Sequence, residues 1–285
     1  MKVLQLVLCA LSLLGLGVRV DAAVLYGATA SGAAGRLFRL DPATGAQLQD
    51  VGPLSDAAGT NYPITGMAFH PTTGVLYGST GNNPQATAAL LVTIDPATAL
   101  VTVVGAFNTG ITNSSGTPST MGDIGFDAAG NLFGVGTIGG PQLYSIDAAT
   151  AQATVIGNTG LTSTTGGGLA ISSAGIFYGT PTASRYGTYD STTGAYTNIT
   201  NPVKPGGGGA YAALDFSPAG VLYGLNSAPG SPPPTFLVTI DPATGTVTSL
   251  GGSVQSLDAI AFRIPEPSVL MLLVPAAVAL VRRRR

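Results

Sequence analysis

Two short stretches recur along the chain, first as Leu25-Tyr26-Gly27 and Asp41-Pro42-Ala43-Thr44-Gly45. The first returns, at intervals of about 45 to 56 residues, as Leu76-Tyr77-Gly78, Leu132-Phe133-Gly134, Phe177-Tyr178-Gly179 and Leu222-Tyr223-Gly224. The second returns as Asp95-Pro96-Ala97-Thr98, Asp147-Ala148-Ala149-Thr150, Asp190-Ser191-Thr192-Thr193-Gly194 and Asp241-Pro242-Ala243-Thr244-Gly245. The two series alternate, which indicates five copies of one structural unit.

Each copy contains the chemistry of strands joined by tight turns. Apolar residues alternate with other residues before each Asp, as in Phe38 and Leu40, which is the pattern of a strand with one buried face. In the turn that follows, the Asp carboxylate can accept a backbone hydrogen bond, Pro fixes φ and Gly supplies a positive φ. A further short strand ends at Ala68-Phe69, before a turn that begins at His70. Five copies of four antiparallel strands predict an all-β fold, a five-bladed β-propeller of four-stranded blades.

The two ends of the repeat region are expected to share one blade. The region begins with the strand that carries Leu25-Tyr26-Gly27, so its first copy lacks a first strand. A strand of the missing type occurs only at the far end, at residues 257–262. A blade closed by both termini in this way leaves no free edge between the first and last copies.

The first 22 residues have the pattern of a secretory signal peptide. Lys2 precedes an apolar run, and the small residues after the run favour cleavage between Ala22 and Ala23. The one cysteine of the chain, Cys9, lies inside this segment, so the mature protein is expected to form no disulfide and to use no cysteine chemistry. An uncleaved anchor is the alternative.

The C-terminal segment, residues 265–285, shows three features in order. Pro265, Glu266 and Pro267 form a short motif, and an apolar span of residues 269–281 follows it. The chain then ends in four arginines: Arg282, Arg283, Arg284 and Arg285. This order resembles the PEP-CTERM sorting signal of bacterial surface proteins. The chain is therefore divided into a signal peptide (1–22), a propeller (23–264) and a sorting signal (265–285).

The resemblance implies partners and a location. PEP-CTERM proteins are carried by Gram-negative bacteria that make exopolysaccharide, and their sorting signal is recognised by an exosortase, a membrane protease or transpeptidase. The expected partners are thus the secretion machinery and an exosortase. The apolar span would hold the chain in the inner membrane before processing, after which the protein would reach the cell surface, the outer envelope or the extracellular matrix. An ordinary tail anchor is the alternative.

The charge of residues 23–264 excludes one class of partner. Five Lys or Arg residues stand against eleven Asp, a net charge of about −6, and no Glu is present. A nucleic-acid-binding surface needs clustered cations to displace counterions from the phosphates, so no nucleic-acid partner is expected.

Candidate binding residues lie in two places. The connections opposite the short turns are long and unequal, and long loops on a rigid scaffold often carry binding residues; the bulky or charged side chains singled out there are Tyr62, Arg185, Tyr186 and Lys204. Three acids that do not recur are expected on the innermost strands, near the central channel: Asp123, Asp215 and Asp258. Their carboxylates could hold a calcium ion or flank a glycosidic bond. The repeated Asp residues and His70 are interpreted as turn residues.

The sequence therefore predicts an exported binding or structural propeller, associated with exopolysaccharide or another surface component. It is not expected to be an enzyme, because residues 23–264 contain a single His and no Cys or Glu, which leaves few catalytic groups. No cofactor is expected, apart from the calcium ion that the channel acids could hold. The alternative is a polysaccharide-active enzyme that uses the channel Asp residues, and a third reading is a matrix protein without a specific ligand.

The sorting signal can be tested by replacing Pro265, Glu266 and Pro267 with alanine. If an exosortase reads the motif, the altered chain should stay in the inner-membrane fraction, whereas Ser268→Ala, the matched control beside the motif, should be sorted normally. Cell fractionation and immunoblotting measure the outcome. Identical distribution of the altered and unaltered chains would identify the segment as a simple tail anchor.

Overall fold

The computed structural model describes residues 23–30, 32–82, 85–112, 116, 118–138, 142–162 and 167–263. The predictions for the signal peptide, its cleavage after Ala22 and the sorting signal lie outside the described residues. Within them, the one helix is a 3₁₀ turn at Gln85–Thr87, and no helix is long and apolar enough to cross a membrane.

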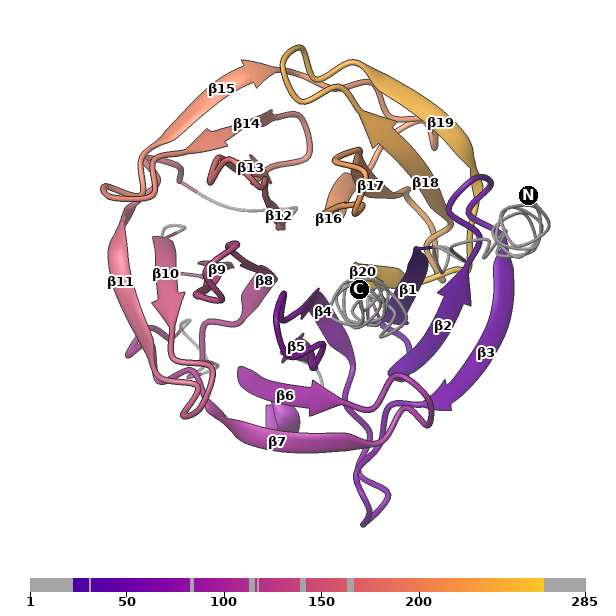
Figure 1. Ribbon diagram of the computed structural model, residues 1–285, viewed down its shortest axis with the longest axis vertical. Helices are drawn as coiled ribbons and strands as arrows, with labels where there is room; N and C mark the ends of the chain where they lie inside the picture. Colours follow the sequence, from indigo (N-terminus) through magenta and orange to yellow (C-terminus); the bar gives the residue numbers. More distant parts are fainter. Residues whose placement is uncertain are drawn as a thin grey trace, which may run out of the picture. The chain divides into compact units, whose positions relative to one another are not determined.

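The described part of the chain forms five four-stranded antiparallel blades arranged around an axis (Figure 1). Blade 1 contains β20 (Leu257–Arg263), β1 (Val24–Thr29), β2 (Arg36–Leu40) and β3 (Gln47–Pro53). Blade 2 contains β4 (Ile64–Phe69), β5 (Leu76–Thr80), β6 (Leu90–Ile94) and β7 (Val101–Ala106). Blade 3 contains β8 (Met121–Phe126), β9 (Leu132–Gly136), β10 (Gln142–Ile146) and β11 (Ala153–Asn158). Blade 4 contains β12 (Gly168–Ile171), β13 (Phe177–Thr180), β14 (Tyr186–Tyr189) and β15 (Tyr196–Thr200). Blade 5 contains β16 (Ala210–Phe216), β17 (Leu222–Ser227), β18 (Thr235–Ile240) and β19 (Val247–Gly252).

The predicted all-β propeller of five blades is confirmed. In Figure 1 the first strand of each blade lies nearest the axis and the fourth strand lies at the rim. Blade 1 takes its innermost strand, β20, from the end of the domain, and β20 pairs with β1 from Val24↔Arg263 to Ala28↔Ala259.

The Leu-Tyr-Gly motif lies on the second strand of each blade, and its glycine makes room for side chains of the flanking strands. A Cβ atom on Gly27 would lie 2.8 Å from Cδ1 of Leu40, and one on Gly179 would lie 2.1 Å from the Tyr189 ring. The residue that ends the third strand thus covers the glycine of the second. A larger residue at Gly179 would have to displace the Tyr189 ring, which fills this space in blade 4.

The aromatic residue of the same motif packs against the next blade. Its partner lies at or next to the end of that blade's innermost strand, and the ring centroids are 4.7 to 5.7 Å apart in the pairs Tyr26–Phe69, Tyr77–Phe126, Tyr178–Phe216 and Tyr223–Phe262. At the seam between blades 3 and 4, Phe133 and Ile171 take these places in one apolar cluster. The aromatic residue of the Leu-Tyr-Gly motif and the apolar residue at the end of the innermost strand both recur in the sequence. In the structure they contact each other across the boundary between two blades.

The turns between third and fourth strands make a second contact between blades, at the rim. A Cβ atom on Gly105 would lie 2.8 Å from the carbonyl oxygen of Thr150, and one on Gly157 would lie 1.9 Å from that of Thr193. Each of these outer-strand glycines therefore lets the Asp-x-x-Thr turn of the next blade sit directly on the backbone.

The recurring Asp residues act within these turns. Oδ1 of Asp41 accepts the N–H of Ala43 at 2.9 Å, and the other four turns repeat this bond. Gly45 has the expected positive φ, 76°. His70 has a comparable role, since its Nδ1 accepts the N–H groups of Thr72 and Thr73, each at 3.2 Å.

A double-mutant cycle tests the seam contact. Tyr223→Leu and Phe262→Leu should each lower the free energy of unfolding. The double variant should lower it by less than the sum of the two single effects, and the difference, about 0.5 to 1.5 kcal/mol, measures the ring contact. Urea unfolding of the purified chain measures the four free energies. Tyr223→Leu combined with Phe69→Leu, whose ring belongs to another seam, should be additive. Additivity in both pairs would show that the rings contribute only through their buried area.

Candidate functional site

The five innermost strands meet around the axis and are built from small residues there. The residue opposite the aromatic of each Leu-Tyr-Gly motif is small in four blades: Ala68, Gly125, Ala170 and Ala261. In blade 5 the same position is Asp215, which pairs with Tyr223. Two residues earlier on these strands, Asp123 of blade 3 takes a position that is Gly or Ala in the other blades. Two of the three predicted channel acids therefore occupy positions at which the other blades carry almost no side chain.

Asp123 is fully buried and joins three blades. Its Oδ2 accepts the backbone N–H of Leu169 at 3.0 Å and that of Leu214 at 3.1 Å, from the innermost strands of blades 4 and 5. Its Oδ1 accepts the N–H of the next residue, Ile124, at 2.9 Å. These N–H groups lie on strands that have no neighbour on the axial side. The carboxylate thus supplies the acceptor that a further strand would otherwise provide.

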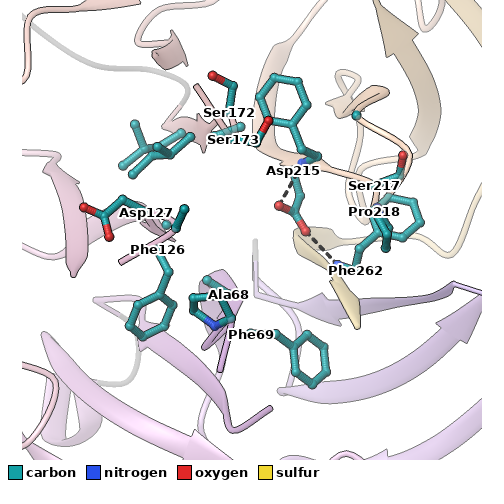
Figure 2. A pocket seen from close by; sticks show the side chains of 18 residues that line it. Ala68, Phe69, Phe126, Asp127, Ser172, Ser173, Asp215, Ser217, Pro218 and Phe262 are labelled. Carbon is teal, nitrogen blue, oxygen red and sulfur yellow. Dashed lines mark hydrogen bonds between the residues drawn. The ribbon is translucent and has the colours of Figure 1, made fainter. Parts of the chain in front are cut away.

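Asp215 joins blade 5 to blade 1 in the same manner. Oδ2 accepts the N–H of Phe262 on β20 at 2.6 Å, and Oδ1 accepts the N–H of Phe216 at 2.8 Å. Unlike Asp123, Asp215 is partly exposed, and Figure 2 shows its carboxylate directed toward the middle of the space between the blades. It therefore links the closing strand to the ring and remains within reach of a ligand.

The two carboxyl groups have unusual proton affinities. Burial raises the pKa of Asp123 well above its ordinary value of 3.8, even though the three N–H donors act in the opposite direction. Burial raises the pKa of Asp215 to about 7, again against the effect of its two N–H donors. Asp190 of a rim turn behaves in the opposite way, since hydrogen bonds from Thr192 and Thr193 lower its pKa to about 2. Asp215 is therefore poised to gain or lose a proton near neutral pH.

A cavity of about 310 Å³ opens at the axis beside Asp215, among the short turns that follow the innermost strands (Figure 2). Ala68, Gly125 and Ala170 leave the space open, and the Phe rings of the seams flank it. Ser172 and Ser217 supply hydroxyl groups, each of which accepts a backbone N–H of its own turn. Asp127 also lines the wall, but its carboxylate points away from Asp215 and accepts the N–H groups of its own turn.

Two residues predicted to bind a ligand are used inside the protein instead. Tyr62 is 5% exposed, packs in the core at the seam of blades 1 and 2, and donates its hydroxyl to Asp56 at 2.8 Å. Tyr186 is fully buried on β14, and its hydroxyl donates to the carbonyl oxygen of Pro242 in the turn of blade 5. Each hydroxyl therefore contributes to contacts within the protein, between or within blades.

The remaining predicted residues lie apart from the cavity. Arg185 is exposed just before β14, Lys204 is partly buried in the connection from β15 to β16, and Asp258 is partly buried on β20; none of them lines the cavity. In the described ranges, no three His, Asp or Glu side chains gather closely enough to hold a metal ion.

The sequence did not single out Ser172 or Ser217 as binding residues. Both begin the turn that follows an innermost strand, as His70 does in blade 2, and the sequence indicates only a turn role for His70. The repeated innermost strands, which end at Ile171 before Ser172 and at Phe216 before Ser217, are the signal that could have found the site, because they place these turns at the mouth of the channel.

Residues 50–231 match a family described as a repeat of unknown function (DUF6923). The chain belongs to this family. The match extends from β3 past the end of β17 and so covers most of the blades. No curated protein matches the chain in sequence.

Several solved structures are weakly similar to this member of the DUF6923 family. A protein of unknown function from Bacteroides thetaiotaomicron is 12% identical, with a TM-score of 0.46 over 80% of this chain, and the chain spans 64% of its length. One from Bacteroides caccae is 8% identical, with a TM-score of 0.46 over 86% of this chain and 100% of the other. A protein described provisionally as a gluconolactonase is 11% identical, with a TM-score of 0.47 over 84% of this chain and 82% of the other. Likenesses this weak carry no functional argument.

The pKa of Asp215 predicts how stability depends on pH. A carboxyl whose pKa is higher in the folded state than in the unfolded state contributes stability below about pH 4, and this contribution is lost as the pH rises through about 7. The Asp215→Asn variant keeps an acceptor oxygen and serves as the reference. Between these pH limits the free energy of unfolding of the unaltered protein should fall by about 1 to 3 kcal/mol relative to that variant. The expected fall is smaller than full burial would give because Asp215 is partly exposed. Urea unfolding at several pH values measures both proteins. Parallel curves would show that Asp215 has an ordinary pKa.

Proposed function

We propose that this chain is an exported propeller of the bacterial envelope or matrix that binds a surface component, with exopolysaccharide as the expected partner. The signal-peptide pattern and the resemblance to the PEP-CTERM sorting signal support export and exosortase-dependent sorting. The family and the propeller fold leave the partner open, so the axial site carries the proposal of binding.

The cavity beside Asp215 is the observation on which binding depends. It has about 310 Å³ of space, the small end of the range for ligand pockets, and it combines apolar walls with the inward-directed Asp215 carboxyl and the hydroxyl groups of Ser172, Ser173 and Ser217. A single sugar residue has the matching chemistry, with an apolar ring face and hydroxyl groups at its edge. Because the five blades are packed at the axis and at the rim, the site is preorganised and should lose little entropy on binding.

An enzyme is the second candidate, and the pKa of Asp215 favours it. A carboxyl that titrates near 7 is suited to general acid or base catalysis. Glycosidases, however, use two carboxyl groups on either side of the scissile bond. Here Asp123 is fully buried with three N–H donors, and Asp127 is directed away from the cavity. The arrangement around Asp215 therefore favours binding over cleavage.

The purified full-length chain, presented to a glycan array and to isolated exopolysaccharide, tests the proposal. Saturable binding without shortening of the polysaccharide is expected. Gly125→Ala adds a methyl group to the cavity wall where its nearest neighbours are 3.6 Å away, so it should fold normally but weaken binding. Leu48→Ala, at an exposed position on the outer strand β3, should leave binding unchanged.

Two outcomes would contradict the proposal. Release of oligosaccharides that stops in Asp215→Asn would identify an enzyme. Absence of saturable binding to any polysaccharide would indicate a matrix protein without a specific ligand.

A further inference from the structure

Asp215 is the one charged side chain directed into the axial cavity of the described structure. The equivalent residues of the other blades are Ala or Gly, so nothing at the same level faces it across the space. Among the described residues that line the wall there is no Lys, Arg or His. A ligand would therefore meet a single carboxyl group surrounded by small and apolar groups.

The carboxyl group has acceptor capacity left for a ligand. A carboxylate offers about four lone-pair sites, and Asp215 uses one on each oxygen for the N–H groups of Phe216 and Phe262. Ser172 and Ser217 each accept one backbone N–H, so their own O–H groups can turn toward the cavity. The site thus offers a carboxylate acceptor on blade 5, with Ser217 in the turn that follows it and Ser172 in the equivalent turn of blade 4, around one cavity.

The charge around the cavity favours a cation. The Asp residues of the five rim turns follow the third strands on the same side of the ring as the short turns at the cavity mouth. Hydrogen bonding lowers the pKa of four of them, so these four remain ionised at neutral pH: Asp95, Asp147, Asp190 and Asp241. A cation entering the cavity would approach through this negative potential and then pair with a carboxylate in a partly desolvated site.

A bare metal ion does not fit this donor set. Calcium takes six to eight oxygen ligands, as a rule from several carboxylates, and no cluster of acids occurs among the residues that the structure describes. An ammonium group needs only a few acceptors, and a carboxylate with one free lone pair on each oxygen can provide two of them.

We propose that the axial cavity binds an amine-bearing saccharide residue, with its ammonium group on the Asp215 carboxylate and its hydroxyl groups near Ser172 and Ser217. This inference rests on the proposed polysaccharide-binding function and names the substrate class of the same site. It requires an ionised Asp215, so ammonium binding and the loss of the Asp215 proton are linked.

The pH dependence of binding follows from the groups around Asp215. The titratable groups on the elements packed against it are Asp123, Tyr178, Tyr223, Asp258 and Arg263, with Tyr211 on its own strand and His70 and Asp127 on the adjoining turns. Asp123 is protonated more readily than an ordinary Asp because it is buried, and the pKa of Tyr223 is raised by burial. The affinity for an amine should therefore rise as Asp215 ionises near pH 7 and fall again when the amine itself loses its proton.

The test is calorimetric titration of the full-length chain with glucosamine, N-acetylglucosamine and glucose, which share a ring but differ in charge. At about pH 7.5 glucosamine should bind at least about tenfold more tightly than the two neutral sugars, and lowering the pH to about 5.5 should remove this preference. Asp215→Asn should remove it as well. Asp127→Asn, at the same wall but with its carboxylate directed away, should retain it.

The outcomes separate this inference from the proposed function. Equal binding of the three sugars, or an unchanged preference in Asp215→Asn, would overturn the ammonium site even if the chain binds polysaccharide. Failure to bind polysaccharide and all three sugars would overturn both. The comparison of sugars and pH values needs only the unaltered protein, so the inference stays testable if Asp215→Asn does not fold.

Discussion

Five sheet edges converge on the axis of this propeller, and their unpaired N–H groups must find acceptors. An edge strand in water can leave these groups to the solvent, but a buried backbone donor without a partner is costly. Asp123 accepts two such groups from blades 4 and 5, and Asp215 accepts one from blade 1. Two carboxylates therefore replace the missing strand along the axis and tie four of the five blades together.

This arrangement also explains the properties of the cavity. Asp123 and Asp215 each occupy a position on an innermost strand at which the other four blades have Ala or Gly. Each Asp side chain fits near the axis only because these other four side chains are small. Burial of these acids raises their pKa values, while the N–H donors partly compensate. Asp123 is fully buried and accepts three backbone N–H groups. Asp215 lies two positions nearer the short turns at the cavity mouth. Its carboxyl group lines the cavity and is accessible to a ligand there.

Much of the fold could be predicted because each blade repeats its local chemistry. The Asp turns and the alternation of apolar residues indicate strands and hairpins without reference to the rest of the chain. The contact between blades could not be derived in this way. The sequence shows that aromatic residues recur at the positions of Tyr77 and Phe126. Only the packing of two blades shows that these two rings are in contact.

The sequence predicts where the acids of the candidate site lie on the strands, but not how the tyrosines near the long connections are oriented. Asp123 and Asp215 stood out because they interrupt a repeat, and they do lie on the innermost strands. Tyr62 and Tyr186 looked exposed because they adjoin long connections, yet both side chains turn inward and donate to acceptors within the protein. The length of a connection does not predict whether an adjoining aromatic side chain points into the protein or into solvent. The short turns come together at the cavity only when the five blades are arranged around the axis.

The central claim is that carboxylates hold the axial N–H groups, and amide hydrogen exchange tests it most directly. The amides of Leu169, Leu214 and Phe262 should exchange slowly although they lie at sheet edges. Asp123→Ala should accelerate Leu169 and Leu214 but leave Phe262 protected, and Asp215→Ala should do the reverse. Fast exchange of these amides in the unaltered protein, or equal acceleration of all three in both variants, would contradict the account.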